Sequence, residues 1–134
     1  MKLYPLRTAC PDPSLPEKEY KEAREIGVVR IGRNFLFFRA FLKHYYIAYS
    51  EIGRCFRRVQ LVPAGMCCGR GELQIENLVI CDEKEELALI QLPGTRAARE
   101  LMKELRARMP DTDFSAPARD RNDEKSNGEQ NTQE

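Results

Sequence analysis

Short apolar runs dominate the middle of the chain, and one amphipathic stripe follows them. Between residues 27 and 92, apolar side chains recur largely with the two-residue period of strands, and turn-forming residues separate the runs. Over residues 95–109 apolar residues recur three or four positions apart, which is the spacing of one helix face. The pattern therefore predicts several short strands closed by one helix. The predicted strand runs are 28–31, 35–38, 45–50, 54–62, 73–80 and 87–92.

Glycine and polar residues indicate where these runs turn. Gly32, Arg33 and Asn34 separate two β-rich runs and predict a hairpin, while the polar residues 82–85 predict a second turn. The alternation of apolar positions slips by one residue at Asn77, which predicts a bulge or bend there.

The two ends of the chain differ from its middle. Prolines 5, 11 and 13 exclude a continuous helix from the first 15 residues and predict an irregular arm. A surface helix is predicted over residues 16–25, where a proline and acidic residues stand at a helix start. After Pro110, Phe114 is the only large apolar residue, so a solvated, disordered tail is predicted. The predicted parts are an arm with a short helix (1–26), a folded domain (27–110) and a tail (111–134).

Length and composition fit one intracellular domain. The 134 residues are 42% hydrophobic, enough for a single core. The most apolar stretch, residues 35–49, contains Arg39, Lys43 and His44, and is thus no membrane span. The N-terminal residues lack the apolar centre of a signal peptide, so we expect a cytoplasmic protein.

A net charge of +1 conceals two segregated blocks. Residues 30–71 carry eight Lys or Arg against one carboxylate, and residues 72–90 carry six carboxylates against one Lys. Arg57 and Arg58 point to opposite sides of a strand, so cross-strand ion pairing with the acidic block and a binding site for an anionic partner both stay open. The candidate anion-binding residues are Arg30, Arg33, Arg39, Lys43, Arg54, Arg57 and Arg58.

The residues that carry catalytic or metal chemistry form no motif. Five cysteines are an odd number, and the pair Cys67-Cys68 has no CxxC or CxxH spacing, so we expect reduced structural thiols without a metal. His44 is the single histidine and no nucleophile elbow accompanies it. The glycines at 65, 69 and 71 precede no GK[ST] sequence, unlike a phosphate loop. We therefore expect no catalytic residue, no cofactor and no enzymatic activity.

The order of these segments resembles that of the bacterial pleckstrin-homology-like (PH-like) domains. The resemblance rests on Phe35-Leu36-Phe37-Phe38, on the stretch 46–52, on the later strands with their polar turn, and on the helix at 97–109. It implies an α+β, mainly β fold: a bent antiparallel sheet or barrel of seven strands capped by one C-terminal helix. It also implies an adaptor that binds peptides, proteins or anionic lipid head groups. The first strand–strand loop, which holds the lipid-binding cluster in eukaryotic relatives, offers only Arg30 and Arg33 here.

The functional expectation is thus a non-enzymatic binding or scaffold domain that recognises a protein or peptide partner. The alternative is a peripheral domain that binds an anionic lipid or other anionic surface through its Arg- and Lys-rich strands. No nucleic-acid partner is expected, and homo-oligomerisation stays open.

Overall fold

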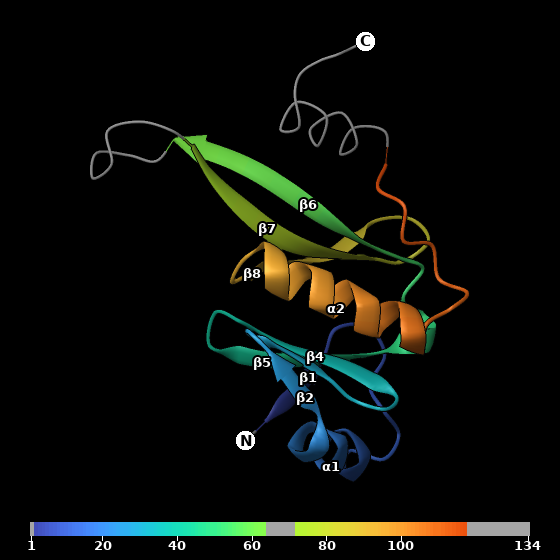
Figure 1. The fold of residues 1–134 in the computed structure, drawn as a ribbon. Coiled ribbons are helices and arrows are strands. Elements are labelled where there is room, and N and C mark those ends of the chain that lie inside the picture. The colour runs from blue at the N-terminus through green and yellow to red at the C-terminus, as the bar shows by residue number, and fades with distance from the viewer. Residues whose placement is uncertain (1, 64–71, 118–134) are drawn as a thin grey trace.

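The computed structural model describes residues 2–63 and 72–117 and consists mainly of strands, with two α-helices (Figure 1). A short 3-10 helix, η1 (Tyr49–Glu51), joins the two halves of the strand order. The other elements, in chain order, are β1 (Leu3–Pro5), α1 (Ser14–Glu22), β2 (Arg24–Ile26), β3 (Val29–Ile31), β4 (Phe35–Ala40), β5 (Lys43–Ala48), β6 (Arg54–Pro63), β7 (Glu72–Cys81), β8 (Glu86–Leu92) and α2 (Thr95–Arg108).

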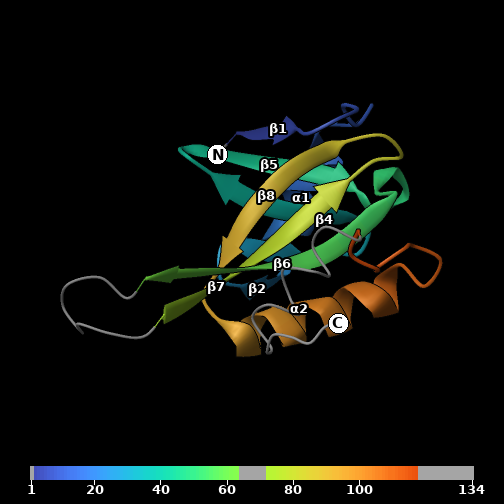
Figure 2. The same cartoon turned by 90° about the horizontal axis from the view of Figure 1, so that it is seen from above.

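The strands form two separate sheets. The first has the order β1-β5-β4-β3-β2, and the second has the order β6-β7-β8. All neighbouring strands are antiparallel except β1, which pairs in parallel with β5. Figures 1 and 2 show the two sheets layered over one another, with α2 running along one side of the layers and α1 on the outer side of the first sheet.

The central strand β4 is apolar without alternation because it is covered on both faces. Leu36 and Phe38 belong to the main core, whereas Phe35 and Phe37 pack on the other face beneath α1. The ring of Tyr20 from α1 meets that of Phe37 edge to face, with 5.3 Å between the centroids. The run of four buried residues therefore reflects two cores, one on each side of the sheet.

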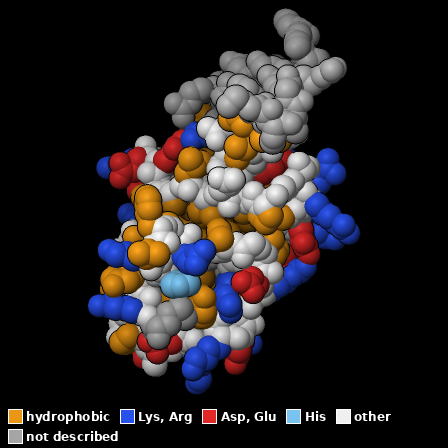
Figure 3. All heavy atoms as spheres, turned by 90° about the vertical axis from the view of Figure 1, so that its left-hand side faces the viewer, with side chains coloured by type: hydrophobic (Ala, Val, Ile, Leu, Met, Phe, Trp, Pro, Cys, Tyr) orange, Lys and Arg blue, Asp and Glu red, His pale blue; other side chains and the backbone are white. Residues whose placement is uncertain are grey.

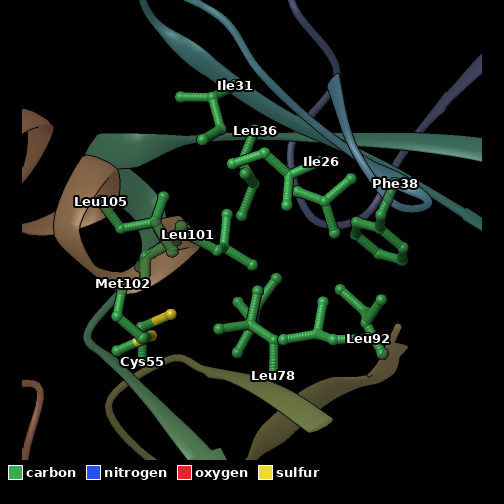
Figure 4. Packing of buried hydrophobic residues seen from close by; sticks show 14 of the residues in the cluster. Ile26, Ile31, Leu36, Phe38, Cys55, Leu78, Leu92, Leu101, Met102 and Leu105 are labelled. Carbon is green, nitrogen blue, oxygen red and sulfur yellow. The ribbon is translucent and has the colours of Figure 1, made fainter. Parts of the chain in front are cut away.

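The main core lies between the two sheets and is closed by α2 (Figure 4). The first sheet contributes residues such as Ile31 and Leu36, and the second contributes Leu78 and Leu92. As the sequence predicts, α2 presents one apolar stripe to this core and a charged face to solvent. The stripe consists of Ala98, Leu101, Met102, Leu105 and Met109, all of them buried.

A buried ion pair joins β6, β7 and the start of α2. The side chain of Glu76 is 0% exposed and accepts two hydrogen bonds from Arg57, at 3.0 and 2.8 Å. The hydroxyl of Thr95, the first residue of α2, donates a third at 2.9 Å. A carboxylate buried in this way is tolerated because every partner is a hydrogen-bond donor and one is charged.

Several predicted elements differ from the structure. The sheets are not closed into a barrel, because β6–β8 pair with no strand of β1–β5. The surface helix predicted over residues 16–25 is α1, which ends at Glu22. It ends there because Ala23 is extended and β2 follows at once, pairing with β3. The N-terminal arm contains β1, whose Pro5 lies at the last position of a short edge strand, where proline is tolerated.

The expected bulge at Asn77 is also wrong. The β6–β7 and β7–β8 ladders run through Asn77, and the irregularity falls between Ile80 and Cys81. Here β7 is buried on both faces, because Leu78 and Ile80 face the main core while Val79 and Cys81 pack with Phe56 on the other side. Because residues on both faces of β7 are apolar, the alternation of apolar positions slips at Asn77 although the ladder has no bulge there.

Residues 111–117 of the predicted tail lie against the domain, and the rest of that segment is outside the described residues. Asp113 forms an isolated parallel bridge with Arg54, and Phe114 packs against the main core. Asp113 and Phe114, at the start of the predicted tail, thus contact the domain, and the ring of Phe114 lies between β6 and α2.

Candidate functional site

The structure divides the seven candidate basic residues between the two sheets. Arg54, Arg57 and Arg58 lie on β6 in the second sheet, and the other four belong to the first. All three arginines of β6 hold carboxylates. Arg57 pairs with Glu76 on β7, Arg58 with Glu86 on β8, and Arg54 with Asp113. Cross-strand ion pairing, one of the two alternatives left open by the sequence, is confirmed for Arg57 and Arg58.

Arg30 is also engaged within the domain. Its guanidinium lies over the ring of Tyr20, 4.3 Å from the centroid, and donates to the Tyr20 carbonyl oxygen at 3.2 Å. Glu25 lies 3.8 Å away on the neighbouring strand. Arg30 therefore anchors α1 to the first sheet. Arg33 is exposed in the β3–β4 turn, distant in the strand register from Arg39 and Lys43.

Arg39 and Lys43 flank the turn of the β4–β5 hairpin, on opposite faces of the sheet. Ala40 faces Lys43 and Arg39 faces His44 in the register, so a two-residue turn, Phe41 and Leu42, connects the strands. We name residues 39–43 the hairpin tip. Both turn side chains are almost wholly in solvent, Phe41 at 96% and Leu42 at 94%, whereas the other exposed large hydrophobic residues described by the structure reach only 36–52%.

The backbone of the hairpin tip is held in an unfavourable conformation. Phe41 has φ +58°, the left-handed region that a bulky residue seldom adopts. The neighbouring β2–β3 hairpin has the same two-residue turn length, and the residue at the matching position is Gly27, with φ +63°. Glycine adopts this conformation without steric cost, and phenylalanine does not. No packing within the described part of the chain compensates Phe41, because its side chain is exposed.

Cations surround the apolar turn. The parallel pairing of β1 with β5 places Leu3 opposite His44 and thereby brings Lys2 level with Lys43. Their ammonium groups lie 5.1 and 5.0 Å from the centroid of one ring, that of Tyr4. Arg39 is exposed on the other strand of the hairpin. Lys2, Arg39 and Lys43 thus form a basic collar behind two apolar side chains.

The β2–β3 turn extends this end of the sheet. The backbone N–H of Arg39 donates to the carbonyl oxygen of Val28 at 3.1 Å, and the Val28 side chain is 38% exposed. A shallow hollow of about 350 Å³ beside the two turns is lined by residues that include Arg30, Arg39 and His44. Figure 3 looks onto this end of the molecule, where Lys and Arg side chains and hydrophobic side chains surround the single histidine.

This arrangement can contact a surface that presents negative charge in front of an apolar layer. The collar supplies cations at the level of the charge, and Phe41 and Leu42 extend beyond it as the apex. Arg39 and Lys43 are evident as candidates from the sequence, but Phe41 and Leu42 are not, because no Gly, Asn, Asp or Pro marks that turn. The available signal was length: a run from 35 to 49 is too long for one strand of a small domain.

The cysteine, histidine and acidic side chains bear on metal and thiol chemistry. Within residues 2–63 and 72–117, no group of three or more His, Cys, Asp or Glu side chains is placed to hold a metal ion. Burial raises the pKa of the Cys55 thiol to about 12. Cys67, Cys68 and the glycines at 65, 69 and 71 lie outside the described residues. In the described part of the chain, no helix has the length and apolar character needed to cross a membrane.

Comparisons of the chain with protein-family models, with curated proteins and with solved structures found no match.

Proposed function

We propose that this chain is a non-enzymatic binding domain that docks on anionic membrane surfaces through the hairpin tip. The observation that carries the proposal is the combination at residues 39–43 of two fully exposed apolar side chains with a basic collar. Binding of a protein or peptide partner is a second proposed function, and it involves a different surface.

The apolar contribution comes from Phe41 and Leu42. Transferring a fully exposed side chain of this size out of water is worth about 1.5–3 kcal/mol. In solution neither residue gains any of this free energy, and Phe41 also adopts a costly φ. Strained residues persist where the strain serves a function, and contact with an acyl layer would offset the strain here.

The electrostatic contribution comes from Lys2, Arg39 and Lys43. Each Lys or Arg close to an anionic lipid surface contributes about 1 kcal/mol, and the effect decays within a Debye length of about 10 Å at 0.1 M salt. Glu25, the ionic partner of Arg30, also lines the hollow beside Arg39, so it offsets part of the positive charge on that face of the sheet.

The same proposal includes a PH-like architecture. Four consecutive antiparallel strands β2–β5, three further antiparallel strands β6–β8 and a terminal helix over the core support it. The strand β1 and the helix α1 are additions to that plan, and β1 contributes Lys2 and Tyr4 to the collar. We further propose that the protein acts in the cytoplasm, where membrane leaflets carry the anionic lipids that this collar fits.

Cosedimentation with vesicles tests the proposed function. The full chain is mixed with phosphatidylcholine vesicles that contain either no phosphatidylserine or about 30% phosphatidylserine, at 0.1 and 0.5 M NaCl. We expect binding to the anionic vesicles at low salt, weaker binding at high salt because the collar is screened, and little binding to neutral vesicles.

Charge-reversal variants give the matched control. Lys43→Glu should weaken vesicle binding, whereas Lys103→Glu, on the exposed face of α2, should leave it unchanged. Equal loss in both variants would mean that net charge alone drives association. Absence of binding to anionic vesicles by the unmodified chain would refute the proposal.

A further inference from the structure

The chain adds its own C-terminal segment to the edge of the second sheet. Asp113 forms a parallel bridge with Arg54, and the backbone N–H of Cys55 donates to the carbonyl oxygen of Asp113 at 3.0 Å. The guanidinium of Arg54 also bonds the Asp113 carboxylate at 3.0 Å. At Asp113 the segment thus contacts β6 in the way that an added peptide strand contacts a sheet edge.

The segment occupies a groove between β6 and α2. Phe114 is half-buried against the main core, with the guanidinium of Arg106 from α2 5.6 Å from its ring centroid. Ala116 packs against the cluster that contains Phe56. A hollow of about 290 Å³ remains in this groove, lined by Phe56, Arg57, Met102, Arg106 and residues 114–116. The segment therefore fits the groove but does not fill it.

The segment is attached so that it can leave without unfolding any other element. The side chains of its ion pair are 37% and 47% exposed, a setting in which such pairs contribute only about 0–1 kcal/mol. Apart from the single bridge at Asp113, residues 113–116 belong to none of the described helices or strands. The segment follows a turn in which the N–H of Thr112 donates to the Met109 carbonyl oxygen.

We propose that the groove between β6 and α2 is a peptide-binding site, and that residues 113–116 occupy it as a tethered ligand which a protein partner displaces. This site is distinct from the hairpin tip, which lies on the other sheet. The partner presents an extended peptide with a carboxylate, then an aromatic residue, and then an apolar residue two positions further on.

Each position of this peptide pattern follows from a contact of the tethered segment. Arg54 selects the carboxylate, which is ionised at neutral pH as exposed aspartates are, and the hydrogen bond from the Ser115 side chain lowers the pKa of Asp113 further. The apolar surface beside Arg106 selects the aromatic ring. Because the hollow is underfilled, a peptide with Leu at the position of Ala116 should bind more tightly than the chain's own sequence.

Fluorescence anisotropy with a labelled peptide tests the proposal. The probe has the sequence of residues 110–117, and the proteins are the full-length chain and its Asp113→Ala and Phe114→Ala variants, in which the tethered segment is weakened. A tethered ligand competes at an effective concentration in the millimolar range. We therefore expect both variants to bind the probe at least about tenfold more tightly than the unmodified chain. Adding Arg54→Glu to either variant should abolish this binding.

A site-resolved measurement accompanies the titration. In Asp113→Ala the amide of Cys55 should exchange with solvent faster than in the unmodified chain, and the probe should restore its protection. Equal affinity of the probe for all three proteins, or no binding to any of them, would overturn the proposal. Dimerisation of the unmodified chain that the probe reverses would assign the groove to the segment of a second copy, and would also overturn it.

Discussion

Replacing Phe41 by glycine should separate membrane binding from fold stability. The substitution removes the most exposed large hydrophobic side chain described by the structure, and it places at the β4–β5 turn the same residue that forms the β2–β3 turn. Since both turns have their first residue at φ near +60°, glycine suits the position better than phenylalanine does. The two properties should therefore change in opposite directions.

The magnitudes follow from the exposure and the backbone angle. Loss of the transfer free energy of Phe41, about 1.5–3 kcal/mol, should weaken vesicle binding about 10- to 150-fold. Relief of the left-handed conformation gains about 1–2 kcal/mol, and the greater entropy of glycine in the unfolded chain removes about 0.5–1 kcal/mol. The free energy of unfolding should thus stay constant or rise by about 1 kcal/mol.

Vesicle cosedimentation measures the affinity of Phe41→Gly for membranes, and urea unfolding of the same preparation measures its free energy of unfolding. Leu89→Ser is the matched control, because Leu89 is 51% exposed on the second sheet, away from the hairpin tip, and its loss should leave vesicle binding unchanged. Binding of Phe41→Gly to anionic vesicles as tight as that of the unmodified chain would refute the role of Phe41 in docking. A loss above about 1 kcal/mol in the free energy of unfolding would also contradict this prediction, since Phe41 would then support the fold.

Three further predictions concern the core. Leu101→Ala should lower the free energy of unfolding by about 2–5 kcal/mol and Lys103→Ala by less than about 0.5 kcal/mol, and equal values in urea titration would contradict the closing role of α2. Arg57→Ala leaves Glu76 buried without its cation and should cost about 3–5 kcal/mol, measured in the same way; a cost below about 1 kcal/mol would mean that the pair is dispensable. Because burial raises the pKa of Cys55 to about 12 from the ordinary 9.0, the contribution of Cys55 to stability should be constant below pH 9 and be lost between pH 9 and 12. Cys55→Ala should remove that part of the decline in pH-dependent unfolding.

The sequence predicted those elements in which local pattern and tertiary packing agree. The apolar stripe of α2 is confirmed, since it buries a regular set of positions, and the strand at 54–62 is confirmed as β6, although its neighbours Cys55 and Phe56 are both buried. The pattern failed where strands are buried on both faces, as at Asn77, or where long-range pairing decides, as in β1. Local rules assign Pro5 to an irregular arm, and only the distant strand β5 makes it part of a sheet.

The candidate site was predicted only in part, for a similar reason. A count of basic residues finds Arg39 and Lys43, but the same count includes Arg57, which the fold uses to neutralise a buried carboxylate. The exposure of Phe41 and Leu42 could not be inferred from composition, because apolar residues between strands normally belong to the core. Their role emerges only once the register of the hairpin is known.

The ion pairs between β2 and α2 bear on how the domain forms during synthesis. Arg24 at the edge of the first sheet pairs with Glu100 and Glu104 of α2, partners 76 and 80 residues further along the chain. Until α2 leaves the ribosome, the apolar faces of both sheets lack the helix that closes them. The core must therefore stay open until α2 has been synthesised, and before that point the chain exposes strand surface on which aggregation can begin.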